Sequence, residues 1–148
     1  MTQTTSPTAM GVVPFARHAR VDTLPAAPGT GLARIPDAPE LTNHIASVHA
    51  GALFTVGETA SGAAMVGAFP DLIGGVRAVT RKSEIRYLKI ARGEITARAV
   101  LAEPAEAIRG RLSEAGRADF EVVVTLEDPG GQTVAEMSVT WNLSRRSA

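Results

Sequence analysis

A single carboxylate, Glu58, lies within a stretch of sequence whose only other ionisable groups are two histidines. The stretch runs from Asn43 to Pro70, and its later part, 50–68, is dominated by alanine and glycine. Small residues let a segment pack closely on every side, so a lone carboxylate there is costly unless it is paired or faces a wet cleft. Carboxylates perturbed in this way are common catalytic groups. Glu58 is therefore the first candidate for a base or a nucleophile.

The small-residue segment has the composition of a buried helix. We expect this helix over 50–68, with Ser47 able to cap its start and Pro70 unable to continue it. Before it, Ala16–Leu24 and Gly31–Pro36 have the pattern of short strands separated by a turn. A helix that is small or apolar on all sides must be covered all round. One sheet covers only part of such a helix, so a partner chain is expected.

Strands are expected after the helix. The predicted strands are Ala78–Lys89, Glu94–Ala102, Asp119–Asp128 and Gln132–Leu143, with a further helix within Glu103–Gly116. The last two strands flank the turn sequence Asp-Pro-Gly-Gly, which is typical of an antiparallel hairpin. The predicted fold class is therefore α+β, with a long central helix wrapped by a curved antiparallel sheet.

Composition narrows the classes of function. The 148 residues suit one domain, 15–148, preceded by a flexible segment, 1–14. Fifteen basic and fifteen acidic residues balance to a formal net charge of zero, so nucleic acid is not an expected partner. The chain has no cysteine, and its three histidines have no acidic residue at ligand spacing, so no metal site is expected. No signal peptide or membrane-spanning segment is expected either, and the expected location is cytoplasmic.

The segment from Asn43 to Glu58, in which His49-Ala50-Gly51 precedes the carboxylate, resembles a known family. It is similar to the hotdog-fold acyl-CoA thioesterases, of the phenylacetyl-CoA and 4-hydroxybenzoyl-CoA type, and to related bacterial hotdog domains of unassigned function. In that group an Asn precedes a His-Gly-Gly element, and an Asp or Glu follows on the central helix. The resemblance covers roughly 16–143 and implies a hotdog fold and hydrolysis of an acyl-CoA or related thioester without a cofactor.

The resemblance also implies a role for each residue of the motif. Glu58 is expected to act as a nucleophile on the thioester or as a general base for water. Asn43 is expected to orient water or substrate near that carboxylate. Ala50 stands where the family has its first glycine and is expected to polarise the thioester carbonyl through its backbone N–H. Gly51 corresponds to the second glycine, and His49 supports the turn.

Helix geometry places these groups apart within one chain. The unpaired N–H groups at a helix start suit a developing oxyanion. Glu58 lies seven residues beyond Gly51, which is about 10 Å further along the axis. Two antiparallel copies of the helix would bring the carboxylate of one chain to the helix start of the other. The expected assembly is therefore a homodimer, or a homotetramer that contains it, with two shared sites.

Several alternatives stay open. Glu58 could be a structural carboxylate bonded to threonine or backbone groups, and the domain could bind an acyl-CoA or a small apolar ligand without hydrolysing it. Arg81 and Lys82 are candidates for contacts with the phosphates of CoA, although such runs usually form solvated strand faces. Hydratase chemistry is disfavoured, because no His follows an Asp in a strand-to-helix loop. The acyl group is not defined by the sequence.

Overall fold

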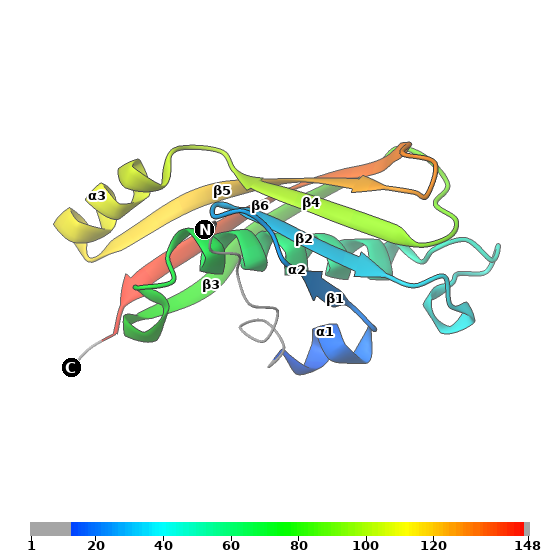
Figure 1. Ribbon diagram of the computed structural model, residues 1–148, viewed down its shortest axis with the longest axis horizontal. Helices are drawn as coiled ribbons and strands as arrows, with labels where there is room; N and C mark the ends of the chain where they lie inside the picture. Colours follow the sequence, from blue (N-terminus) through cyan, green and yellow to red (C-terminus); the bar gives the residue numbers. More distant parts are fainter. Residues whose placement is uncertain (1–12, 147–148) are drawn as a thin grey trace.

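The computed structural model describes residues 13–146 and contains a six-stranded antiparallel sheet curved around one long helix (Figure 1). The helices are α1 (Pro14–His18), α2 (Ala50–Ala68) and α3 (Ala105–Ala115), with short 3-10 helices at Pro39–Leu41 and Ile73–Gly75. The strands are β1 (Asp22–Leu24), β2 (Thr30–Ile35), β3 (Val76–Tyr87), β4 (Ile95–Leu101), β5 (Arg117–Glu127) and β6 (Thr133–Arg145). They lie in the order β1-β2-β4-β5-β6-β3. The predicted α+β architecture is confirmed.

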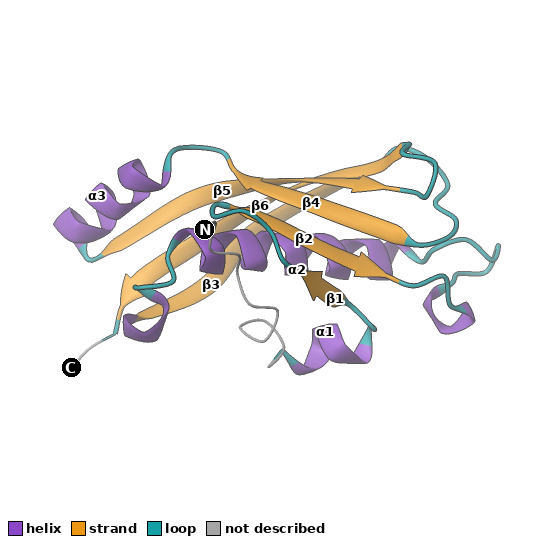
Figure 2. Ribbon diagram, in the orientation of Figure 1, coloured by secondary structure: helices purple, strands orange, loops and turns teal. Residues whose placement is uncertain are grey.

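The central helix α2 runs along the inner face of the sheet (Figure 2) and spans the predicted residues. Its small side chains let strand β2 approach its backbone. A Cβ atom on Gly31 of β2 would lie 2.0 Å from the carbonyl oxygen of Ala60 and 2.7 Å from the nitrogen of Ala64. Because real Cβ atoms essentially never come this close to backbone, glycine is required at position 31.

Strand β3 forms one edge of the sheet. It pairs with β6 along its length, and no other described strand covers its second edge. The pairing shifts register between Thr80 and Lys82, which marks a β-bulge at Arg81. Helix α2 packs mainly against β2, β4 and β5 and lies further from β3. The sheet therefore leaves the β3 side of the helix comparatively open.

The N-terminal region differs from the prediction. The expected strand over Ala16–Leu24 is wrong for its first part, because Pro14–His18 is helix α1 and only Asp22–Leu24 is a strand. Pro14 occupies the first helical turn, where a fixed φ and a missing N–H are tolerated, and basic residues in the last turn suit a helix end. Of the segment predicted to be flexible, residues 1–12 lie outside the described residues.

Three large side chains of α2, its C-cap and β6 fill part of the core. Met65, Phe69 and Trp141 are all buried in the hydrophobic core. The ring of Phe69 meets that of Phe120 edge to face, with centroids 5.8 Å apart. These residues therefore hold α2 against the sheet.

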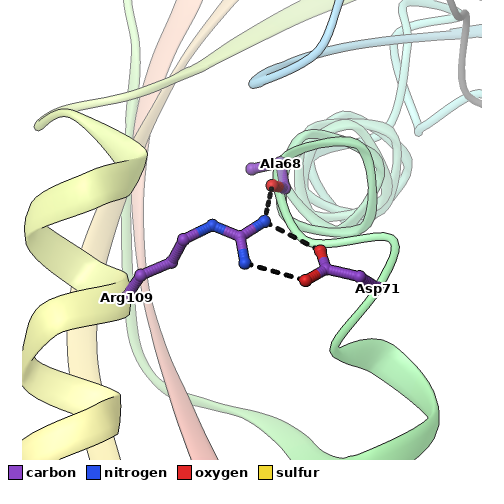
Figure 3. A network of polar contacts seen from close by, with 3 residues as sticks. All are labelled: Ala68, Asp71 and Arg109. Carbon is purple, nitrogen blue, oxygen red and sulfur yellow. Dashed lines mark hydrogen bonds and ion pairs between the residues drawn. The ribbon is translucent and has the colours of Figure 1, made fainter.

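Helix α3 is fastened to the end of α2 by one arginine (Figure 3). Arg109 donates to the carbonyl of Ala68 at 3.2 Å and to both carboxylate oxygens of Asp71, at 3.0 and 2.8 Å. Its guanidinium carbon also lies 5.2 Å from the centroid of the Phe69 ring. A cation at this position satisfies an orphan carbonyl and suits the negative end of the helix dipole. The network fixes the C-terminal end of α2.

Candidate functional site

The start of α2 is exposed over 49–51 and has one backbone donor without a partner among the described residues. His49 is the N-cap, and its Nδ1 accepts the N–H of Gly51 at 2.8 Å. The N–H groups of Ala52 and Leu53 donate to the carbonyl of His49. The N–H of Ala50 makes no hydrogen bond to another described residue. A single free donor therefore stands at the positive end of the helix dipole.

The predicted cap, Ser47, is wrong. Its side chain is bound in the preceding loop, where its hydroxyl lies 2.8 Å from Nδ2 of Asn43. Oδ1 of Asn43 also accepts the N–H groups of Ile45 and Ser47, at 3.1 and 3.0 Å. Asn43 therefore shapes the loop that leads into α2, with one Nδ2 hydrogen not used by these contacts.

A groove of about 370 Å³ opens beside the first turn of α2. Its walls come from the loop before α2, from the helix start, and from the end of β3 with the residues that follow it. The lining residues are Asn43, Ile45, Ser47, Val48, Ala50, Leu53, Tyr87, Leu88, Lys89, Ile90 and Ala91. The groove is thus mostly apolar, with a small number of polar side chains, as is usual for sites that bind small molecules.

Glu58 is half-buried on α2, and burial raises the pKa of its carboxyl above the ordinary value. Its side chain makes no hydrogen bond or ion pair with another residue in the range 13–146. Neighbouring hydroxyls bond elsewhere: Thr55 and Thr59 donate to carbonyls one turn back on their own helix. The interpretation of Glu58 as a structural carboxylate held by threonine or backbone therefore has no support among the described residues.

The side chain of Glu58 faces the open side of α2. A Cβ on Gly57 would meet Met137 and Leu126, so this residue faces β5 and β6. Ala60 lies round the helix towards β2, as its contact with Gly31 shows. Viewed down the helix, Ala60 lies about 60° from Gly57 on one side, and Glu58 lies about 100° from Gly57 on the other side. It therefore points to the side where β3 forms the open edge.

The structure brings together Asn43, His49, Ala50 and Gly51, but not Glu58. In one chain the carboxylate is eight residues beyond Ala50 on the same helix, which is about 12 Å along the axis. A carbonyl carbon bound at the N–H of Ala50 is therefore out of reach of Glu58 from the same chain.

The two cations predicted to contact phosphate lie away from this groove. Lys82 is opposite Thr140 of β6, whose neighbours Val139 and Trp141 face the core, so Lys82 projects from the outer face of the sheet. Arg81 Nη1 lies 3.9 Å from Asp119 Oδ2, and Lys82 Nζ lies 3.0 Å from Glu84 Oε1. Their role in binding CoA remains a prediction.

One lining residue, Tyr87, was not singled out from the sequence. It is far from α2 along the chain, and no local motif marks it. The alternation expected over 78–89 could have placed Tyr87 on the inner face, but not next to Ala50.

Within the described range, no group of three or more His, Cys, Asp or Glu side chains could hold a metal ion. No helix of that range is long and apolar enough to cross a membrane.

Comparison with solved structures places this architecture in a known class. PA5026 of Pseudomonas aeruginosa, a protein of unknown function described as a probable thioesterase, has a TM-score of 0.83 and 27% identity, over 95% of this chain and 93% of its own. A thioesterase family protein of Silicibacter pomeroyi has a TM-score of 0.76 and 19% identity, over 94% and 95% of the two chains. The chain has the hotdog fold of the thioesterase superfamily.

A third structure is the PaaI protein of the phenylacetic acid degradation operon of E. coli. It has a TM-score of 0.67 and 17% identity, over 95% of this chain and 90% of its own. Within the hotdog class the chain belongs to the family described as "Domain of unknown function (DUF4442)", whose model matches residues 2–143. None of the curated proteins compared with the sequence matches it.

Proposed function

We propose that the protein hydrolyses an acyl-CoA or related thioester at sites shared between two copies, with Glu58 as general base or nucleophile. The observation that carries the proposal is the state of Glu58. Its carboxylate is half-buried, has no partner among the described residues, and faces the open side of α2. Such a group is suited to proton transfer or attack, because desolvation makes a carboxylate more basic.

The helix start supplies the second requirement of the reaction. The free N–H of Ala50 can donate to the thioester oxygen as negative charge develops on it. Glu58 of the other copy then removes a proton from an attacking water, or attacks the carbonyl carbon to form an acyl-glutamate anhydride that water cleaves in a second step. The C–S bond breaks, the acyl carbon gains the hydroxyl of water, and the thiolate takes up a proton. Asn43 lines the same groove, and its unused Nδ2 hydrogen is the group proposed to orient water or substrate.

The open edge of β3 suggests how two copies meet. Helix α2 runs antiparallel to β3: Ala50 is level with Tyr87, and Ser61 reaches Trp141, which pairs with Thr80. The eight residues from Ala50 to Glu58 rise about 12 Å, which is the length of between three and four strand residues, so Glu58 is level with about residue 83. A two-fold axis at residue 85 would therefore place Glu58 of one chain level with Ala50 of its partner. Antiparallel pairing of the two β3 strands would also make the two α2 helices antiparallel.

Charges on the outer face of β3 favour this register. Pairing centred on Ile85 sets Glu84 of one chain opposite Arg86 of the other, which are opposite charges. Pairing centred on residue 84 or 86 would instead set like charges opposite each other. The inner-face side chain of Tyr87 is also about half exposed in the single chain, as expected for a surface that a partner covers.

The comparisons support hydrolysis of a thioester as the class of activity. PA5026 is described as a probable thioesterase, and the Silicibacter pomeroyi protein as a member of a thioesterase family. These names support the class and leave the acyl group, the role of Glu58 and the shared site as proposals.

The test is release of free thiol from a panel of short, medium and aromatic acyl-CoA esters. Wild-type protein should turn over at least one ester, and Glu58→Gln should lower the rate by about 100-fold or more. Glu121→Gln, on the exposed outer face of β5, is the matched control and should keep the wild-type rate. Turnover that survives Glu58→Gln would contradict the mechanism. Binding of esters without turnover would favour the alternative, a non-catalytic module.

A further inference from the structure

Tyr87 links the edge strand β3 to the start of the central helix. Its hydroxyl donates to the carbonyl of Ala50 at 3.2 Å. Tyr87 is the last residue of β3, a strand that otherwise lies at some distance from α2. The contact therefore joins β3 to the first turn of α2 across the groove that both elements line, next to the free N–H of Ala50.

The peptide unit between Ala50 and Gly51 is held at both ends. Its N–H donates to Nδ1 of His49 at 2.8 Å, and its carbonyl accepts the hydroxyl of Tyr87. Because a peptide unit is planar, two contacts on opposite sides fix its orientation. The preceding unit carries the N–H of Ala50 and is separated from it by only one pair of backbone torsions. Fixing one unit therefore restrains the direction of the other.

We propose that Tyr87 is a positioning residue for the hydrolysis proposed above: its hydroxyl holds the first turn of α2 so that the N–H of Ala50 points at the bound thioester. The inference rests on the proposed function, because it assigns the N–H of Ala50 to the oxyanion. The ring of Tyr87 also lines the groove beside Asn43 and Ala50. Its hydroxyl acts on the turn, and its ring contributes to the wall.

The environment of Tyr87 keeps the hydroxyl able to donate. Desolvation raises the pKa of the phenol above its ordinary value, so the group stays protonated throughout the neutral range. The carbonyl of Ala50 has a second lone pair, so it can accept from Tyr87 as well as from the helix. No other tyrosine occurs in the chain.

The variant Tyr87→Phe separates the two parts of the side chain, because it keeps the ring and removes only the hydroxyl. We expect kcat to fall about tenfold, the value of one ordinary hydrogen bond, with KM changed less than about twofold. Thr140→Val removes a hydroxyl from the outer face of β6 that bonds no described side chain, and it should leave both constants unchanged. An unchanged kcat in Tyr87→Phe would overturn the proposal. A lower melting temperature with an unchanged kcat would do the same.

Backbone amide signals test the contact without any substrate. In ¹⁵N-labelled protein, Tyr87→Phe should shift the amide resonances of Ala50 and Gly51 and speed their hydrogen exchange, whereas Thr140→Val should not. If the wild-type protein hydrolyses no ester in the panel, the proposed function fails. The holding of the turn by Tyr87 is then judged by these two amides, and unshifted resonances would overturn it.

Discussion

The indole N–H of Trp141 donates to the hydroxyl of Ser61 at 3.0 Å, and both side chains are buried. The same hydroxyl lies 2.6 Å from the carbonyl of Glu58 and donates to it. Strand β6 is therefore connected, through two hydrogen bonds, to the turn of α2 that carries the candidate carboxylate. This connection sets the rotation of the helix on the sheet and thereby the direction of Glu58.

Loss of the Ser61 hydroxyl should be costly. Ser61→Ala leaves the indole N–H of Trp141 buried without a partner, which costs about 1–3 kcal/mol. We expect the free energy of unfolding in urea to fall by that amount. Ser113→Ala, on the exposed face of α3, should change it by less than about 0.5 kcal/mol. Equal effects of the two substitutions would contradict the importance of the contact.

The raised pKa of Glu58 makes a prediction about the pH dependence of hydrolysis. The reaction needs an ionised carboxylate, and burial makes ionisation harder in the folded protein. The acidic limb of kcat/KM should therefore have its midpoint above the ordinary glutamate value of 4.5. A midpoint at or below that value, measured with any ester that the protein turns over, would argue against Glu58 as the titrating group.

The same shift affects stability with a definite sign. The folded state holds the proton of Glu58 more tightly than the unfolded state does, so the group favours folding below its ordinary pKa. This contribution is lost as pH rises through the raised pKa. The free energy of unfolding of wild type, relative to Glu58→Gln, should therefore decline as pH rises from the ordinary pKa to the raised pKa, and should stay level above the raised pKa. Urea titrations at a series of pH values measure this difference, and an opposite slope would exclude desolvation as the cause.

Two glycines should respond oppositely to alanine. Gly31→Ala drives a methyl group into the backbone of α2, which cannot move aside, and should cost about 3 kcal/mol or more. Gly110→Ala, in the middle of α3, meets no atom within 4 Å and should stabilise the protein by about 0.5–1 kcal/mol. Thermal unfolding of both variants measures the contrast. A well-tolerated alanine at position 31 would mean that β2 and α2 are not in backbone contact.

The proposed pairing of two chains can be trapped covalently, because the natural sequence has no cysteine. Ile85→Cys should place two thiols opposite each other at the two-fold axis, within the Cβ separation of about 3.5–4.5 Å that a disulfide needs. Mild oxidation should then give a dimer on non-reducing gels. Val79→Cys lies six residues further along β3, about 20 Å from the axis, and should not cross-link. Cross-linking through position 79 and not 85 would contradict this register.

The sequence predicted the elements whose signals are local. Helix α2 has the predicted bounds because its alanine- and glycine-rich segment contains no proline before Pro70. The β5–β6 hairpin follows from alternation on either side of a turn sequence. Helix α1 was missed, since five residues carry too little periodicity to distinguish a helical turn from a strand.

The features of the candidate site also divide into those with a local sequence signal, which were predicted, and those set by tertiary contacts, which were not. The grouping of His49, Ala50 and Gly51 at a helix start is local, and the structure has it. The choice of cap was wrong because a histidine, not the nearby serine, accepts the N–H of Gly51. The direction of Glu58 and the contact of Tyr87 with Ala50 depend on how β3 returns beside the helix, and residues 37 positions apart leave no pattern that a single sequence shows.

The bulge at Arg81 also bears on aggregation. A flat edge strand of twelve residues could accept extended chains in many registers and seed open-ended polymers. The bulge twists the first part of β3 out of line, which leaves 82–87 as the regular segment. The opposite edge of the sheet, β1, is only three residues long. Two copies paired about Ile85 would cover the long open edge that β3 has among the described strands, so we expect growth to stop at a closed pair.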